Sequence, residues 1–247
     1  MPDLKMAEAA ATSAGAEVLS VSDLQAWYGE SHILHGIKFN VKAGEVVTLL
    51  GRNGAGKTTT LKSVMGIIGK RSGSIRFNNE NIIRASSDRI ARMGIAFCPE
   101  ERGIFASLDV RENLLLPPVV RSGGLSLDQI FDLFPNLKER LGSQGTKLSG
   151  GEQQMLAIAR ILRTGARFLM LDEPTEGLAP VIIQQIGHTI ARLKSEGFTI
   201  LLVEQNFRFA STVADRYYIV EHGKVIDGFA NSELSANMDK LHTYLGV

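Results

Sequence analysis

A glycine-rich segment that ends in lysine and threonine carries the clearest chemistry in this sequence. It reads Gly51-Arg52-Asn53-Gly54-Ala55-Gly56-Lys57-Thr58 and directly follows the apolar run 46–50. A buried strand, a glycine turn and a helix together point several backbone N–H groups at one place, where phosphate oxygens can approach. A glycine turn with a lysine beside it is the plain alternative, which this context disfavours. We therefore expect a nucleoside triphosphate to be bound by Gly51, Asn53, Gly54, Ala55, Gly56, Lys57, Thr58 and Thr59.

Two of these residues have expected tasks beyond the glycine turn. Lys57 would reach the β- and γ-phosphates, and the hydroxyl of Thr58 would bind Mg²⁺. The nucleotide is not expected to be GTP, because the chain has no Asn-Lys-x-Asp segment of the kind that recognises guanine.

A pair of carboxylates, Asp172 and Glu173, ends the apolar run 168–171. Ligands of open α/β sheets bind at the carboxyl ends of the strands, so both side chains are expected there. Asp172 is placed to hold Mg²⁺ through its water shell, and Glu173 to accept a proton from the water that attacks the γ-phosphate. A strand that ends in a solvated acidic turn is the alternative, and the phosphate loop earlier in the chain favours the catalytic interpretation.

A serine and two glycines precede a predicted amphipathic helix in the segment 148–153, Leu-Ser-Gly-Gly-Glu-Gln. Ser149 and Glu152 fit a capping box, which is a purely structural explanation. The box does not explain Gly150 and Gly151, because a glycine at a helix start costs roughly 0.5–1 kcal/mol relative to alanine. We therefore expect a ligand to need close access to backbone N–H groups there, as at a second phosphate-binding helix terminus.

The elements that must position these residues alternate between strand and helix. Short, almost continuous apolar runs are typical of parallel strands covered on both faces, and they occur at 46–50, 168–171 and 200–203. Apolar residues at helical spacing occur between or beside them, at 57–65, 152–162 and 181–194. This order predicts an α/β P-loop NTPase with a mostly parallel, doubly wound sheet.

Other segments of the chain predict additions to this sheet. Alternating polar and apolar residues indicate an antiparallel β subdomain at 20–28, 36–41 and 74–77, and a hairpin at 217–220 and 225–226. Between about 100 and 150 the strand pattern disappears, and prolines and glycines divide an inserted helical subdomain. Residues 1–17, rich in Ala, Ser, Gly and Glu, predict a mostly disordered tail, so that 18–247 form one nucleotide-binding domain.

Composition excludes several other classes of protein. The 247 residues are 44% hydrophobic and 21% charged, as in a globular chain. Lys plus Arg number 27 against 26 Asp plus Glu, and the net charge of +1 gives no bulk attraction to nucleic acid or anionic lipid. The single cysteine, Cys98, excludes a disulfide framework and is expected to be a small buried residue in a reducing cytoplasm. No apolar run approaches the roughly 20 residues of a membrane-spanning helix, so a membrane link would need a partner.

The three chemical segments occur in the order and spacing of the Walker A, signature and Walker B motifs, and the chain resembles ABC-transporter ATPase subunits from about Val18 onward. More narrowly, Pro99-Glu100 and the segments 173–180 and 202–206 resemble the LivF-type subunits of branched-chain amino-acid importers. Urea and other amide importers use closely similar subunits. The resemblance implies an ATPase, with ATP and Mg²⁺ as ligands, that drives import of branched-chain or other amino acids at the cytoplasmic face of the cell membrane.

The resemblance also implies partners. Two such cassettes close head to tail, so Ser149, Gly150 and Gly151 would contact the nucleotide of a second cassette, either a copy of this chain or a related one. The segment 177–180 resembles the loop that communicates across that dimer. The helical subdomain would receive a membrane permease, and an extracytoplasmic solute-binding protein would act indirectly.

An aromatic pair near the end of the first strand bears on adenine binding. Tyr28 is similar to the family's residue that stacks on adenine. Neighbouring residues of a strand face opposite ways, so Trp27 is either a core residue or the alternative stacker. We expect Tyr28 to stack.

Two positions depart from the usual motifs. Glu100 stands where most cassettes have the glutamine that links Mg²⁺ and water to the membrane-facing lobe. Gln205 stands where most have the histidine that contacts the γ-phosphate. Both are expected to act in catalysis, and Glu100 is also expected to bind the metal, because glutamate can still bind Mg²⁺ or accept a proton, whereas glutamine keeps a donor and loses titration. Since the LivF-type pattern includes both changes, we do not expect them to inactivate the enzyme, but we do expect them to make its basal turnover modest.

Two other functions use the same motifs. A cassette ATPase that acts on DNA or ribosomes would carry long coiled coils, zinc insertions or a second cassette, for which this chain has no room, so no nucleic-acid partner is expected. A regulatory module that binds ATP with weak hydrolysis would also tolerate Glu100 and Gln205. The three motifs together favour the transport ATPase.

Overall fold

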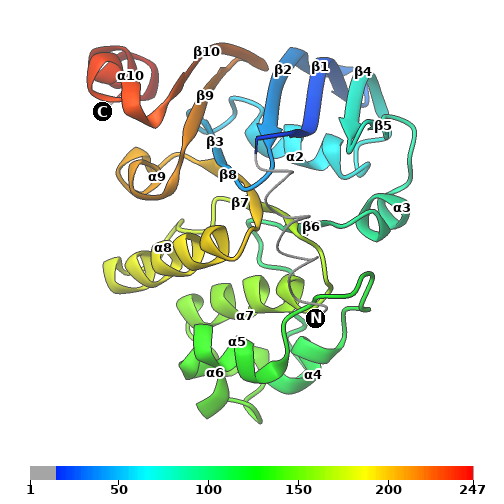
Figure 1. Ribbon diagram of the computed structural model, residues 1–247, viewed down its shortest axis with the longest axis vertical. Helices are drawn as coiled ribbons and strands as arrows, with labels where there is room; N and C mark the ends of the chain where they lie inside the picture. Colours follow the sequence, from blue (N-terminus) through cyan, green and yellow to red (C-terminus); the bar gives the residue numbers. More distant parts are fainter. Residues whose placement is uncertain (1–14, 247) are drawn as a thin grey trace, which may run out of the picture.

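Two β-sheets and the helices around them make up the computed structural model, which describes residues 15–246 (Figure 1). The strands are β1 (Glu17–Tyr28), β2 (Ser31–Lys42), β3 (Val46–Leu50), β4 (Lys70–Phe77), β5 (Glu80–Asn81), β6 (Ile95–Cys98), β7 (Phe168–Asp172), β8 (Thr199–Glu204), β9 (Arg216–Glu221) and β10 (Lys224–Ala230). The helices are α2 (Lys57–Val64), α3 (Ser87–Arg92), α4 (Val110–Leu115), α5 (Leu127–Leu133), α6 (Pro135–Glu139), α7 (Gly150–Leu162), α8 (Pro180–Ser195), α9 (Phe207–Val213) and α10 (Met238–Leu245).

The larger sheet has the strand order β10-β9-β3-β8-β7-β6. All its pairings are parallel except that of β10 with β9, which form the predicted hairpin. Every residue of β3, β7 and β8 is buried, as their apolar sequences predict. Strand β6 was not predicted, because its four residues between a glycine and a proline are too few to show a period.

The smaller sheet is antiparallel and has the order β2-β1-β4-β5. Its first two strands are longer than predicted. The pairing of β1 with β2 shifts register between Leu24 and Gln25, where Gly36, with φ of 92°, is an extra residue on β2. Such a bulge interrupts the alternation of polar and apolar residues, so the sequence pattern predicted only the part of β2 that begins at Gly36.

Helices α2, α7 and α8 lie where helical periodicity predicts them. Helix α7 begins two residues earlier than expected, at Gly150. Its capping box is confirmed, because Oγ of Ser149 accepts from the Glu152 N–H at 3.3 Å and Oε2 of Glu152 accepts from the Ser149 N–H at 2.8 Å. The cap therefore fixes where α7 starts, directly at the two glycines.

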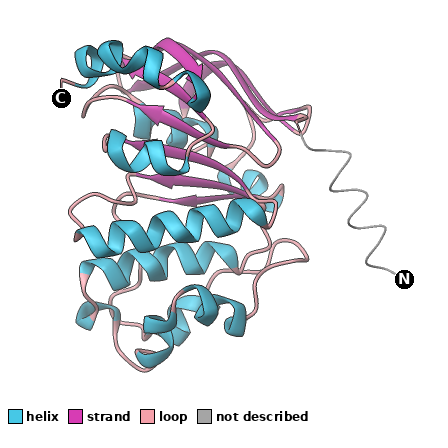
Figure 2. Ribbon diagram, turned by 60° about the vertical axis from the view of Figure 1, so that its left-hand side comes forward, coloured by secondary structure: helices cyan, strands magenta, loops and turns pink. Residues whose placement is uncertain are grey.

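Helices cover both faces of the larger sheet, as the doubly wound class requires. On one face, α2 and α3 share an apolar cluster with both sheets, which includes Leu49, Leu61 and Ile90. On the other face, α8 and α7 form successive layers, and α4, α5 and α6 lie beyond them (Figures 1 and 2).

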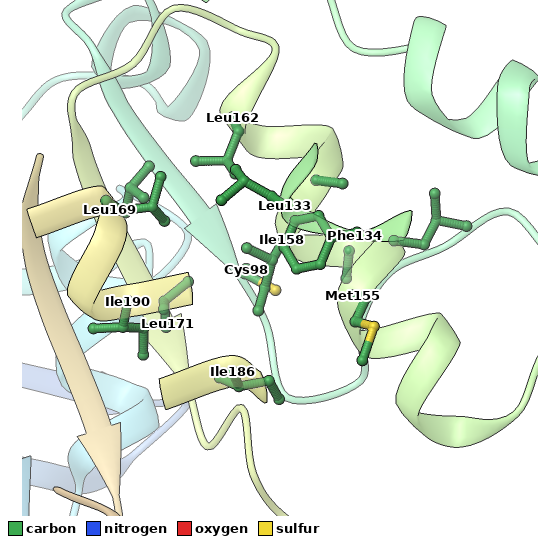
Figure 3. Packing of buried hydrophobic residues seen from close by; sticks show 14 of the residues in the cluster. Cys98, Leu133, Phe134, Met155, Ile158, Leu162, Leu169, Leu171, Ile186 and Ile190 are labelled. Carbon is green, nitrogen blue, oxygen red and sulfur yellow. The ribbon is translucent and has the colours of Figure 1, made fainter. Parts of the chain in front are cut away.

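The apolar cluster of that second face runs from the sheet into the outer helices. Figure 3 shows Leu171 of β7, Ile190 of α8 and Ile158 of α7 in one packed group with Phe134, which follows α5. Cys98 lies within this cluster and is buried, as predicted. Helix α7 thus links the sheet to α4, α5 and α6. Because protein interiors are close-packed, a displacement of these outer helices would be transmitted through α7 to the sheet.

Two expectations concern membrane association and the N-terminus. None of the helices within residues 15–246 is both long and apolar enough to span a bilayer. The predicted disordered tail lies mostly outside the described residues, and Glu17, its last residue, already begins β1.

Candidate functional site

The turn between β3 and α2 depends on glycines that adopt left-handed backbone conformations. Gly54 and Gly56 have φ of 79° and 105°, values that residues with a side chain rarely adopt. A Cβ on Gly56 would also lie 2.9 Å from Cδ2 of Leu34. Gly56 directly precedes α2, so the turn presents the unpaired N–H groups of the first helical turn to one place.

Lys57, the first residue of α2, turns its ammonium back into this loop. Its Nζ is buried and donates hydrogen bonds to the carbonyls of Gly51, at 2.8 Å, and Arg52, at 3.1 Å. The same Nζ lies 3.0 Å from Oε1 of Glu173, which follows β7. A buried charge needs such partners, so Lys57 and Glu173 compensate each other.

Thr58 and Asp172 meet beside this ion pair. Oγ1 of Thr58 donates to Oδ1 of Asp172 at 3.0 Å, while Oδ2 of Asp172 is buried and has no hydrogen-bond partner among the described residues. Burial raises the pKa of Asp172 to about 6; the hydrogen bond from Thr58 opposes this rise, and the charges of Glu100 and Glu173 add to it. An orphaned carboxylate oxygen beside a hydroxyl has the donor chemistry that Mg²⁺ prefers.

A cavity of about 410 Å³ opens over the glycine turn. It brings together residues predicted from distant segments: Tyr28 at the end of β1, Glu100 after β6, and Glu173 after β7. The cavity is lined by Tyr28, Ile33, Asn53, Gly54, Ala55, Gly56, Lys57, Thr58, Thr59, Glu100, Glu173 and Glu176.

The two adjacent aromatic residues of β1 have different surroundings. Tyr28 is 48% exposed and lines the cavity. Trp27 stacks on His32 of β2, with ring centroids 4.4 Å apart and planes 10° apart, and Nζ of Lys70 lies 5.8 Å from its ring centre. Trp27 is therefore occupied by side chains of its own sheet, whereas the ring of Tyr28 is available to a ligand.

The two unusual positions, Glu100 and Gln205, line different cavities, both of which include Glu173. Glu100 lines the cavity, and its pKa is raised by burial and by the negative charges of Glu176 and Glu173. Gln205 is exposed and does not line it; Gln205 lines a neighbouring cavity, also of about 410 Å³, that shares Glu173 and Glu176. A ligand must therefore extend past Glu173, or the loops must move, for Gln205 to contact its phosphate end.

Comparison with known proteins assigns the chain to a family. The family description "ABC transporter" matches residues 34–176, more than half of the chain. The chain belongs to the ABC transporter family. The fold agrees: the solved "ATP binding subunit of ABC transporter" has a TM-score of 0.77 and 28% identity, over 93% of this chain and all of that one.

Curated relatives extend the match over nearly the whole cassette. It is 42% identical to the "High-affinity branched-chain amino acid transport ATP-binding protein BraG" of Pseudomonas aeruginosa, over 93% of this chain and 100% of that protein. It is 36% identical to the "Probable branched-chain amino acid transport ATP-binding protein LivF" of Archaeoglobus fulgidus, over 88% and 94%. It is 34% identical to the "Lipopolysaccharide export system ATP-binding protein LptB" of Escherichia coli K12, over 92% and 97%. The expected family is thus confirmed, and the protein is an ATP-binding cassette and an ATPase.

The Ser149 segment of the cassette lies apart from the nucleotide cavity of its own chain. Ser149 is exposed at the start of α7, and neither it nor Gly150 nor Gly151 lines that cavity. The structure gives Gly151 a packing reason, because a Cβ there would lie 2.9 Å from Cγ1 of Ile182 in α8. A Cβ on Gly150 would have its nearest neighbours at 3.5 Å, in the guanidinium of Arg102. Packing against Ile182 therefore explains Gly151 without any ligand. Only Gly150 has no such explanation and still indicates a ligand that needs close access to the backbone.

This difference predicts separate effects on stability. Gly151→Ala is expected to lower the free energy of unfolding by about 1–3 kcal/mol, because the added methyl overpacks the contact of α7 with α8. Gly150→Ala is the matched control and should be neutral or stabilising by up to about 1 kcal/mol, because alanine favours a helix more than glycine does. Denaturant unfolding measures both, and the second-site change Ile182→Ala, which removes all three atoms that the added methyl would meet, should cost less in Gly151→Ala than in the wild type. Equal stabilities of the two alanine variants would contradict the packing explanation.

Two residues of the cavity were missed by sequence reasoning. Ile33 comes from β2 and shows no chemical motif, so nothing in the sequence could have selected it. Glu176 lies within the segment 173–180 that carries the resemblance, and its place three residues after Glu173 could have suggested a role. Its carboxylate adds negative charge to the same space as Glu100.

Proposed function

We propose that this cassette hydrolyses ATP to drive the import of branched-chain or other amino acids through a membrane permease. The observation that carries the catalytic part is the convergence of Lys57, Thr58, Asp172 and Glu173 beside one cavity. The amino-acid part is supported by the relatives, since the BraG and LivF proteins are named for branched-chain amino-acid transport. The same names favour transport over an action on DNA or ribosomes.

In the proposed mechanism, the N–H groups before and within the first turn of α2 bind the phosphates. Phosphate oxygens compete with Glu173 for the ammonium of Lys57, so binding of ATP releases the Glu173 carboxylate from its ion pair. The freed carboxylate accepts a proton from the attacking water. Glu100 acts from the lining of the same cavity, and Gln205 donates to the γ-phosphate.

Thr58 and Asp172 would hold Mg²⁺, with Glu100 nearby. The buried Oδ2 of Asp172, which lacks a hydrogen-bond partner in the described chain, supports this assignment. No group of three or more His, Cys, Asp or Glu side chains suited to a metal occurs among the described residues, which fits an ion that takes its remaining ligands from water and phosphate. When bound, Mg²⁺ would neutralise charge on the phosphates.

The remaining parts of the proposal concern partners. Ser149, Gly150 and Gly151 would bind the nucleotide of a second cassette, because the start of α7 combines an exposed hydroxyl with the positive end of a helix dipole. The helices in the inserted subdomain of about 100–150 would dock on the permease, holding the protein at the cytoplasmic face of the membrane. An extracytoplasmic binding protein would supply the solute.

Co-purification and reconstitution test this function. The full chain is purified from detergent-solubilised membranes, and the proteins that accompany it are identified by mass spectrometry. We expect a permease and a second cassette, or a second copy. The assembly in liposomes, given the binding protein and radiolabelled leucine, isoleucine or valine, should accumulate the amino acid only with Mg·ATP. An assembly that hydrolyses ATP but moves none of a panel of amino acids would contradict the proposed substrate.

Adenine stacking gives a narrower prediction. Tyr28→Ala is expected to raise the Kd for ATP about tenfold, because stacking of a base on an aromatic ring contributes about 1–3 kcal/mol. Tyr28→Phe keeps the ring and should bind ATP as the wild type does. Isothermal titration with ATP and with inorganic tripolyphosphate distinguishes the contribution of the adenine base to binding from that of the phosphates. The alanine variant should lose affinity only for ATP. Equal losses for both ligands would exclude stacking.

A further inference from the structure

A buried glutamate at the end of β8 is not used by the mechanism proposed above. Glu204 is 2% exposed, and its backbone lies beside Leu50, the last residue before the glycine turn. Its carboxylate has two partners: Oε1 accepts from Oγ1 of Thr175 at 2.8 Å, and Oε2 accepts from the N–H of Asn206 at 3.2 Å. One side chain thus joins the loop after β7 to the turn after β8.

These two partners lie next to the residues assigned to hydrolysis. Thr175 is two residues beyond Glu173, and Asn206 directly follows Gln205. Glu173 has a left-handed backbone, with φ of 43°, which is costly for a residue with a side chain. The N–H of Glu173 donates to the carbonyl of Val203 at 2.9 Å, so β8 holds the loop at Glu173 and again at Thr175.

Burial of a glutamate at the end of a strand costs free energy unless its charge is compensated. Glu204 forms no ion pair within residues 15–246, and burial raises its pKa to about 7 against the opposing effect of the hydrogen bonds from Thr175 and Asn206. A costly buried acid that is kept beside a reaction site is a candidate for a role in the reaction. Among residues lining the neighbouring cavity, Glu173 and Glu176 are the other charged groups, and Lys57 pairs with the first of them.

We propose that Glu204 is a positioning residue for ATP hydrolysis: its two hydrogen bonds hold Glu173 and Gln205 in fixed relation to each other at the γ-phosphate. This inference rests on the proposed roles of Glu173 and Gln205. It requires no contact of Glu204 with the nucleotide, and accordingly Glu204 lies outside the cavity that contains Tyr28 and the glycine turn. Loss of the carboxylate should therefore slow turnover without weakening ATP binding.

Rescue by glutamine at position 204 gives a readout that a merely structural role would not give. The carboxylate accepts from both partners, and the protonated acid can keep both contacts by donating from Oε1 to Oγ1 of Thr175 while Oε2 accepts from the Asn206 N–H. The positioning role therefore does not depend on the charge of Glu204, although burial raises its pKa to about 7. Glutamine at this position can accept from Asn206 and donate to Thr175, so it keeps both contacts and does not titrate.

The test compares kcat and KM of the full chain for three variants. Glu204→Leu is expected to lower kcat about tenfold or more, with KM for ATP within about twofold of the wild type. Thr175→Val removes one hydrogen bond at constant volume and should lower kcat several-fold, and combining the two changes should cost little more than Glu204→Leu alone. Glu204→Gln should keep most of the wild-type kcat, with KM for ATP also close to that of the wild type.

The controls distinguish positioning from folding and from the ATPase assignment. Thr189→Val removes another buried threonine hydroxyl, in α8, and should leave kcat unchanged. Thermal unfolding shows whether Glu204→Leu folds. If it does not fold, the kcat values of Thr175→Val and Glu204→Gln, which conserve volume, test the proposal. An unchanged kcat in Thr175→Val, or a kcat of Glu204→Gln as low as that of Glu204→Leu, overturns the proposal. Wild-type turnover in the same assay tests the ATPase separately, since its absence would contradict the proposed function and this role with it.

Discussion

Glu173→Gln is expected to reduce ATP turnover at least 100-fold while ATP binding is retained. A positioned general base contributes about 10²–10⁴-fold to a rate, and glutamine cannot accept the proton of the attacking water. The side chain that is replaced is only 8% exposed and has its shape reproduced by glutamine. The backbone hydrogen bond from Glu173 to Val203 does not involve the side chain and remains.

Phosphate release and ATP binding are measured on the same preparation. Because hydrolysis would reopen the closed pair of cassettes, light scattering should show an ATP-stabilised dimer in the variant. Glu101→Gln is the matched control, since this carboxylate is exposed, lies outside the cavity and pairs at 3.8 Å with Lys62. Near-normal turnover of Glu173→Gln would exclude Glu173 as the base, and ATP binding without dimers would argue against head-to-tail closure.

Lys57→Ala is expected to weaken ATP binding itself, by about 100-fold or more. Among the residues that the structure describes, Lys57 is the only cation lining the cavity, where its charge acts on phosphates in a partly buried, low-dielectric space. Its removal also eliminates the hydrogen bonds to the carbonyls of Gly51 and Arg52 and leaves the carboxylate of Glu173 without its ion-pair partner. Loss of one member of a buried pair is destabilising, so the folded state must be checked.

Equilibrium binding of Mg·ATP, with thermal unfolding beside it, measures this effect. Lys62→Ala is the matched control, because Lys62 lies on the same helix α2 and outside the cavity. Lys57→Met preserves more of the volume and distinguishes loss of charge from loss of packing. A folded Lys57→Met chain that binds ATP with wild-type affinity would show that the glycine turn does not grip the phosphates through this lysine.

The sequence by itself determined the local features of the site. The glycine turn, Lys57 and Thr58 form one continuous segment, whose conformation follows from glycine backbone freedom and the start of a helix. The Ser149 capping box depends on residues three apart, and the buried strands β3, β7 and β8 are visible as unbroken apolar runs. In each case the interacting groups are near neighbours in the chain.

Tertiary structure alone decided which distant groups meet. The contact of Thr58 with Asp172 depends on the pairing of both β3 and β7 with β8. Stacking of Trp27 on His32 occupied one of two candidate aromatic rings and left Tyr28 beside the cavity. These outcomes depend on strand register and helix packing, which bring together residues with no periodic relation in the sequence.

Long-range packing also distinguishes Gly150 from Gly151 and determines the contacts of Glu204. Gly151 is required by the approach of Ile182 from another helix, whereas Gly150 has no such neighbour. Glu204 looks like an ordinary acid at the end of a strand until the fold places Thr175 and Asn206 around its carboxylate. Residue type and spacing specify the chemistry that the chain can perform, but burial and long-range contacts decide which groups are free to perform it, because both depend on the packing of the whole fold.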